Sequence, residues 1–132
     1  MKIKILLVFT IFLIVFPNLV LGNVLTPKIA GLYSNLTYND EGGDLLGMEI
    51  FVFLGDKRYY ALVQESSGEP SKPHLLPLTL IGEDSIRINY PPGNAIIKLE
   101  GTIYQDKLVI RLHFKSHTTE PITLKRGNSY WQ

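Results

Sequence analysis

Hydrophobic and polar residues alternate along several short segments of the chain. In the segment 107–115, every second residue from Leu108 to Phe114 is apolar, and the other positions hold Lys, Val, Arg and His. The segments 85–90 and 46–54 follow the same period of two. This period is typical of strands that bury one face, whereas no segment shows the 3.6-residue period of a helix. The pattern therefore predicts an all-β protein.

Breaks that contain Gly, Pro, Asn or Asp separate eight predicted strands. The strands lie near Ala30–Asn35, Leu45–Leu54, Arg58–Glu65, Leu75–Leu80, Ser85–Tyr90, Ala95–Tyr104, Lys107–Phe114 and Ile122–Lys125. Most connections are short, so sequence neighbours are expected to pair antiparallel, because a parallel crossover needs about a dozen residues. We expect an up-and-down meander of about eight strands, closed or nearly closed into a β-barrel without free edges. A two-sheet β-sandwich is the alternative.

The first 22 residues have the layout of a secretory signal peptide. Two lysines precede the apolar run Ile5–Phe16, Pro17 follows it, and Val20 and Gly22 are small residues at the positions that precede a cleavage site. An uncleaved membrane anchor is the alternative, but a spanning helix needs about 20 apolar residues. We expect cleavage after Gly22, a secreted or periplasmic location, and a single domain over residues 23–132.

Charge and cysteine content limit the partners and the means of stabilisation. Of the 13 Lys and Arg residues, two fall within the signal segment, which leaves 11 against 12 Asp and Glu. No basic cluster is present, so we expect no nucleic-acid partner. The predicted strands are mostly shorter than the 9–11 residues that a membrane barrel requires, so we expect no integral membrane protein after cleavage. Without cysteine, strand pairing and packing alone must stabilise the domain.

Gly31-Leu32-Tyr33 lies on the first predicted strand, and Arg126 follows the last one. This arrangement resembles the calycins, which include lipocalins, fatty-acid-binding proteins and avidin-like barrels. In many calycins a Gly-x-Trp motif on the first strand packs near a basic residue at the end of the last strand. Here Tyr33 stands in place of the Trp. The resemblance implies a small barrel in which Gly31, Tyr33 and Arg126 close one end, and it implies an interior cavity.

The aromatic residues suggest how such a cavity would be used. The chain has seven Tyr and a single Trp. Core packing explains most aromatics in strands, and a minority can line a ligand site. We expect a small apolar or amphipathic ligand to contact Tyr33, Met48, Tyr60 and Trp131, with no cofactor. Because a free tail rarely carries Tyr-Trp, we expect Trp131 to plug one barrel end; contact with a partner is the other interpretation.

A second hypothesis is a protein–protein interaction module, such as a periplasmic inhibitor or an envelope accessory protein. Its contact surface would be the long, Pro-rich connection between the third and fourth predicted strands. The candidate residues in this connection are Gly68, Pro70, Pro73 and His74.

An enzyme is the third hypothesis. The chain has neither Gly-x-Ser-x-Gly nor Ser-x-x-Lys, and it has no cysteine, so no nucleophile motif is visible. A carboxylate pair, such as Glu49 with Glu65 or Glu100, is what a glycosidase-like cleft would require. We expect no enzymatic activity.

Two groups of residues could in principle ligate a metal. His113 and His117 are four residues apart, which suits a helix rather than a strand end. The acidic residues within 40–44 flank Gly42 and Gly43, but their spacing differs from that of a calcium loop, and turn chemistry explains them. We expect no metal site.

Overall fold

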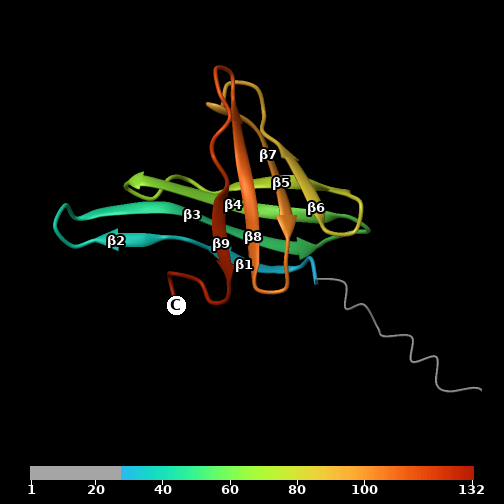
Figure 1. Ribbon diagram of the computed structural model, residues 1–132, viewed down its shortest axis with the longest axis horizontal. Helices are drawn as coiled ribbons and strands as arrows, with labels where there is room; N and C mark the ends of the chain where they lie inside the picture. Colours follow the sequence, from blue (N-terminus) through green and yellow to red (C-terminus); the bar gives the residue numbers. More distant parts are fainter. Residues whose placement is uncertain (1–27) are drawn as a thin grey trace, which may run out of the picture.

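The computed structural model describes residues 28–132, so the expected signal peptide over residues 1–22 lies outside the described residues (Figure 1). The nine strands are β1 (Gly31–Ser34), β2 (Thr37–Asn39), β3 (Asp44–Leu54), β4 (Tyr59–Gly68), β5 (His74–Ile81), β6 (Ser85–Asn89), β7 (Ile96–Ile103), β8 (Lys107–Phe114) and β9 (Ile122–Arg126). Across residues 28–132, no helix has the length and apolar character needed to cross a membrane.

Eight of the strands form a closed antiparallel barrel. Strands β3 to β9 pair in sequence order, and β1 pairs with both β9 and β3, which completes the ring. Tyr33 marks the closure, because it lies opposite Ile50 of β3 on one side and Arg126 of β9 on the other. The all-β class and the closed barrel are thus confirmed, and the sandwich alternative is wrong because β1 joins the two ends of the meander.

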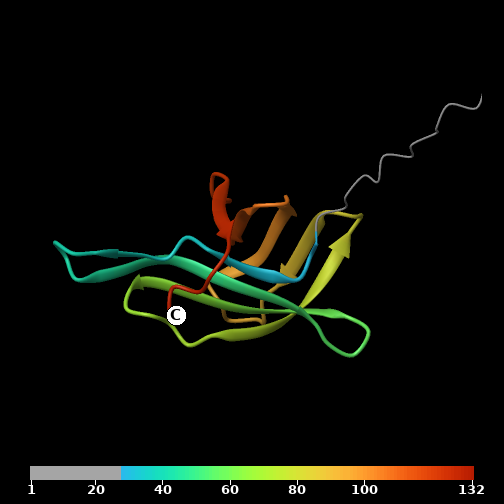
Figure 2. The ribbon, with the colours of Figure 1, turned by 90° about the horizontal axis from the view of Figure 1, so that it is seen from below.

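Strand β2 lies outside the ring and was not predicted as a strand. It pairs with Asp44–Leu46 at the start of β3. The opposite edge of this part of β3 pairs with the end of β4, where Leu45 lies opposite Gly68. Strand β4 therefore runs three residues beyond its predicted end at Glu65. The start of β3, the end of β4 and β2 together form a three-stranded extension that projects from the barrel (Figures 1 and 2).

The strands on opposite sides of the barrel cross at a steep angle. In Figure 1, β3 and β4 run across the view, whereas β7, β8 and β9 run nearly at right angles to them. Inward-facing side chains from both sides fill the space between them. The fully buried core includes Tyr33, Ile50, Ile88, Leu99 and Leu124. Its members occupy alternate positions along each strand, as the period of two predicts.

Candidate functional site

The two ends of the barrel have different chemistry. At the end where β1 begins, the guanidinium group of Arg126 lies over the Tyr33 ring, 4.9 Å from its centroid. Arg126 Nη2 donates hydrogen bonds to the Tyr33 hydroxyl and to the Lys28 carbonyl. The Tyr33 hydroxyl donates to the Ile29 carbonyl at 2.8 Å. A Cβ atom at Gly31 would lie 3.6 Å from Arg126 Nη1, so this glycine borders the same group.

This cluster covers the fully buried Tyr33. Burial raises the pKa of the Tyr33 phenol, and the neighbouring Arg126 charge and hydrogen bond partly offset the rise. The phenol therefore stays protonated and donates its hydrogen bond, while its oxygen accepts one from arginine. Packing of a planar cation on an aromatic face adds to the hydrogen bonds. We call this end the Arg126 end.

A pocket of about 320 Å³ lies at the opposite end, which we call the pocket end. It is built where β3, β5, β7 and β9 begin and where β4, β6 and β8 finish, together with the β6–β7 connection. The lining residues are Asn35, Gly47, Met48, Glu65, Ser66, His74, Tyr90, Asn94, Ala95, Ile96, Leu112, Phe114 and Ile122.

One side of the pocket is polar. Glu65, His74 and Tyr90 occupy inward positions at the same end of three neighbouring strands, since they continue the buried alternation of β4, β5 and β6. The Tyr90 hydroxyl donates a hydrogen bond of 2.9 Å to Glu65 Oε1. The His74 ring lies edge-on to Tyr90, with 6.0 Å between the ring centroids. Burial, and then the adjacent Glu65 carboxylate, raise the pKa of Tyr90 far above its usual range.

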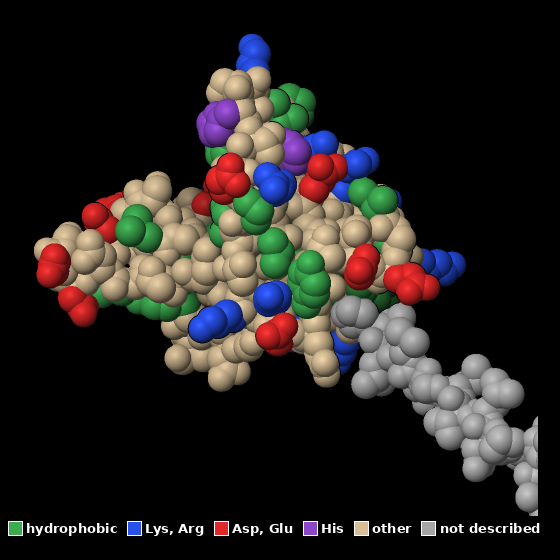
Figure 3. All heavy atoms as spheres, viewed as in Figure 1, with side chains coloured by type: hydrophobic (Ala, Val, Ile, Leu, Met, Phe, Trp, Pro, Cys, Tyr) green, Lys and Arg blue, Asp and Glu red, His purple; other side chains and the backbone are tan. Residues whose placement is uncertain are grey.

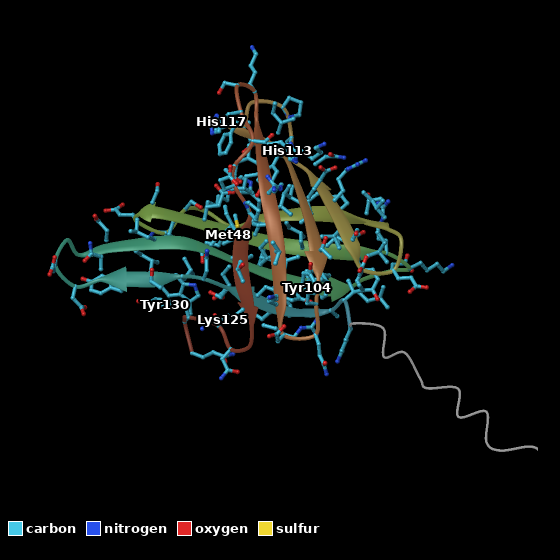
Figure 4. The ribbon with its side chains drawn as sticks, viewed as in Figure 1. Met48, Tyr104, His113, His117, Lys125 and Tyr130 are labelled. Atoms are coloured by element: carbon cyan, nitrogen blue, oxygen red, sulfur yellow. The ribbon has the colours of Figure 1, made fainter. Side chains whose placement is uncertain are left out.

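The other side of the pocket is apolar. Its side chains are Met48 from β3, Ile96 from β7, Leu112 and Phe114 from β8 and Ile122 from β9. Figure 4 shows Met48 near the point where β3 passes behind the crossing strands. The residues of β7, β8 and β9 lie on the inward faces of three neighbouring strands, whereas Met48 lies beside Glu65, its partner in the pairing of β3 with β4. The pocket is therefore amphipathic.

Ser66 and Asn35 complete the rim beside β3. The Ser66 hydroxyl is buried and has no hydrogen-bond partner among residues 28–132. Asn35 Oδ1 accepts a hydrogen bond of 2.7 Å from the Met48 amide, which holds the β1–β2 link against β3. A bulkier residue than Gly47 would collide with Asn35, because its Cβ atom would lie 2.7 Å from the Asn35 carbonyl oxygen.

Of the four residues expected to contact a ligand, the structure brings only Met48 to this pocket. Tyr33 belongs to the Arg126 end. Tyr60 lies on the outer face of β4, where its ring stacks on Phe53 at 6.0 Å. The adjacent Tyr59 takes the inward position, because it pairs with the buried Leu78.

Trp131 lies on the outside of the barrel, so the interpretation that it plugs one end is wrong. Its Nε1 donates a hydrogen bond of 3.0 Å to Gln64 Oε1 on the outer face of β4, and 53% of the residue is exposed. Ser129 Oγ and the Tyr130 amide donate to the two carboxylate oxygens of Glu49, at 2.5 and 2.9 Å. These bonds hold the segment 129–132 across β3 and β4; Figure 4 shows Tyr130 beside the barrel.

The three carboxylates considered for an enzymatic pair lie in three different places. Glu49 is on the outer face of β3 under the segment 129–132, and Glu65 lies in the pocket. Glu100 is on the outer face of β7, where it forms ion pairs with Arg87 at 2.8 Å and Lys98 at 3.2 Å. The hydrogen bond from Arg87 is the largest influence on the pKa of Glu100, and it lowers that pKa. Burial raises the pKa, but the hydrogen bond from Lys98 and the positive charges of Lys98 and Arg87 lower it further, so the net shift is downward. No pair of these three carboxylates shares a cleft.

The histidines on β8 and in the loop after it make separate contacts. His113 lies 3.1 Å from Glu100 and 3.1 Å from Thr118 Oγ1, and the His117 ring stacks on Phe114 at 4.7 Å. Figure 4 shows both at one end of β8, and Figure 3 shows histidines gathered on the same projection. Within residues 28–132, no group of three or more His, Asp or Glu side chains is placed to hold a metal ion.

The Pro-rich connection that was predicted as an interaction loop borders the polar side of the pocket. Gly68 ends β4, Pro70 bridges to Ser66, Pro73 is exposed, and His74 begins β5 and lines the pocket. The structure thus joins one end of the expected loop to the pocket end of the barrel.

Comparisons with protein families, with characterised proteins and with solved structures found no match to this chain. The closed eight-strand antiparallel barrel is consistent with a small calycin-like barrel. The fold and the pocket therefore carry the functional argument.

The pairing of Glu65 with Tyr90 is the feature of the site that the sequence did not reveal. The period of two over the segment 85–90 puts Tyr90 on the same face as Ile86 and Ile88, and continuing the alternation of β4 past Val63 puts Glu65 inward too. Nothing in the sequence alone shows that the two side chains meet.

Proposed function

We propose that this protein binds a small amphipathic molecule in the pocket at the end opposite Arg126. The observation that carries the proposal is the division of the pocket lining. Glu65, His74 and Tyr90 supply polar groups from β4, β5 and the residue after β6, whereas β7, β8 and β9 supply the apolar side chains of Ile96, Leu112, Phe114 and Ile122. Met48 of β3 adds an apolar side chain directly beside Glu65. A few convergent polar groups on an apolar wall are typical of small-molecule sites.

The size of the pocket supports a small ligand. Pockets that hold small molecules commonly have volumes of about 300–1,000 Å³, and the volume here is about 320 Å³. A binding role is favoured over catalysis because Glu65 is the only carboxylate in the lining. The resemblance to calycins agrees with a carrier or sensor role. Export through residues 1–22 stays a prediction.

The pocket can be tested by filling it. Ile122 lines it from β9, whereas the next residue, Thr123, is exposed on the opposite face of the same strand. We expect a fluorescent apolar probe to bind the wild-type protein, and Ile122→Trp to weaken that binding about tenfold or more, because the larger ring occupies the pocket. Thr123→Trp should bind as the wild type does. Equal probe binding by wild type and Ile122→Trp would contradict the proposal.

The interaction-module hypothesis stays a prediction with its own test. If the loop containing Pro70 and Pro73 recognises a partner protein, then replacing both with Ala should abolish recovery of that partner. The same replacement should leave probe binding intact, because neither proline lines the pocket.

A further inference from the structure

The charges around the pocket are unbalanced. Glu65 is the one acidic residue in the lining, and the lining contains neither Lys nor Arg. His74 is the only basic side chain there, and it contacts Tyr90 edge-on rather than forming an ion pair with Glu65. The Glu65 carboxylate therefore has no Lys or Arg partner within the pocket.

The Glu65 carboxylate is only partly satisfied by the protein. Oε1 accepts the hydrogen bond from Tyr90, whereas Oε2 accepts none from any residue in the described range 28–132 and is open to water. Tyr90 cannot neutralise the charge, because its phenol donates a hydrogen bond and keeps its proton. The free oxygen has room for a donor from a bound molecule.

The neighbouring groups suit a cation. The aromatic ring of Tyr90 lies beside Glu65 in the same lining, and aromatic faces attract ammonium groups. An anionic head group would be repelled by Glu65, and a hydroxyl would form a hydrogen bond without compensating the charge. We infer that the ligand is an aliphatic amine, and this inference rests on the proposed function. Its ammonium group pairs with Glu65, and its hydrocarbon body lies against Met48, Leu112 and Ile122.

Three probes with the same chain and different head groups test this inference. Isothermal titration of the purified protein at neutral pH would compare n-octylamine, n-octanol and n-octanoate. The amine is protonated at this pH, since amines of this type have pKa values near 10. We expect octylamine to bind about tenfold more tightly than octanol, because both can donate a hydrogen bond to Glu65 but only the ammonium group adds the attraction of an opposite charge. Octanoate should bind most weakly.

Two matched variants identify the residue responsible. Glu65→Gln keeps an acceptor for Tyr90 but removes the charge, so it should reduce the preference for octylamine over octanol to less than about threefold while octanol affinity is retained. Glu83→Gln neutralises an exposed carboxylate in the turn between β5 and β6, at the Arg126 end, and should leave the preference unchanged.

The outcomes separate the two proposals. If octanol or octanoate binds as tightly as octylamine, or if Glu65→Gln keeps the full amine preference, the choice of an amine is wrong although the pocket binds ligands. If none of the three probes binds the wild-type protein, the proposed binding function itself is wrong, and the inference falls with it.

Discussion

The hydroxyl group of Tyr90 donates a 2.9 Å hydrogen bond to Glu65 Oε1, although the two residues lie 25 positions apart in the sequence. The bond joins the end of β4 to the residue that follows β6, across the start of β5. It fixes the phenol as a donor and leaves the second oxygen of Glu65 free for another group. The polar half of the pocket is thereby organised before any ligand enters.

Removing this bond should alter both stability and its dependence on alkaline pH. Tyr90→Phe leaves the Glu65 carboxylate without its donor, which should cost about 1–3 kcal/mol at neutral pH. The pKa of Tyr90 is raised above its ordinary value of 10.0 in the folded state. The unfolded chain therefore releases this proton first, and the free energy of unfolding falls as the pH rises above 10.0.

We expect the wild-type protein to lose stability more steeply than Tyr90→Phe as the pH rises above about 10. Urea unfolding at several pH values measures the difference. Tyr33, whose pKa is also raised, is present in both proteins and cancels in the comparison. Parallel curves for the two proteins would show that Tyr90 does not contribute to the alkaline loss.

The Arg126 end should contribute to stability through a single side chain. Arg126→Ala removes the guanidinium over Tyr33 and its hydrogen bonds to Tyr33 and Lys28, and we expect a loss of about 1–2 kcal/mol. Lys125→Ala, at the exposed neighbouring position on β9, should change stability by less than about 0.5 kcal/mol. Urea unfolding of both variants decides the matter, and equal losses would mean that the stacking has no specific role.

The ion pairs of Glu100 should show their effect in acid. Glu100 faces Arg87, Lys98 and His113, and its pKa is lowered in the folded state. The stabilisation that Glu100 provides is thus fully present at pH values above its ordinary pKa of 4.5, and it is lost as the pH falls through the lowered pKa of the folded state. Glu100→Gln should cost no more than about 1 kcal/mol at neutral pH, since the pairs are partly exposed. As the pH falls from neutral into acid, the Glu100→Gln variant should lose less stability than the wild type. Urea unfolding of both proteins at neutral and at acid pH would show the difference.

The segment 129–132 should loosen when its carboxylate partner is removed. Glu49→Ala deletes both acceptors that hold Ser129 and the Tyr130 amide. We expect hydrogen exchange of the Tyr130 amide, measured by NMR, to quicken about tenfold, which corresponds to about 1.4 kcal/mol. Gln64→Ala, which removes the partner of Trp131 and a hydrogen bond to Ser71 but neither acceptor on Glu49, should quicken it less. Unchanged exchange in Glu49→Ala would show that another contact holds the segment.

The strands of the barrel were largely predictable because alternation is a local property. Strand β8 was predicted with its observed bounds, and most other strands within one residue at each end. Strand β2 was missed because Thr37, Tyr38 and Asn39 are all exposed, so burial imposes no alternation on them. The end of β4 was missed because residues 66–68 are strand only through their pairing with the start of β3.

The site was less predictable because it depends on register and on distant contacts. Tyr59 and Tyr60 are chemically similar neighbours, and the pairing of Tyr59 with the buried Leu78 and of Tyr60 with Pro77 shows which one faces inward. Trp131 lies beyond the last strand, where alternation gives no information. Its position follows from a hydrogen bond to Gln64, 67 residues away in the sequence.

The most direct test of the account is to observe where a ligand contacts the protein. NMR of the methyl groups during titration with n-octylamine reports on both faces of the barrel at once. We predict that the shifted signals belong to Met48, Ile96, Leu112 and Ile122 in the pocket. Shifts confined to the exposed outer-face residues Leu62 and Leu75, with the pocket methyls unchanged, would contradict the account.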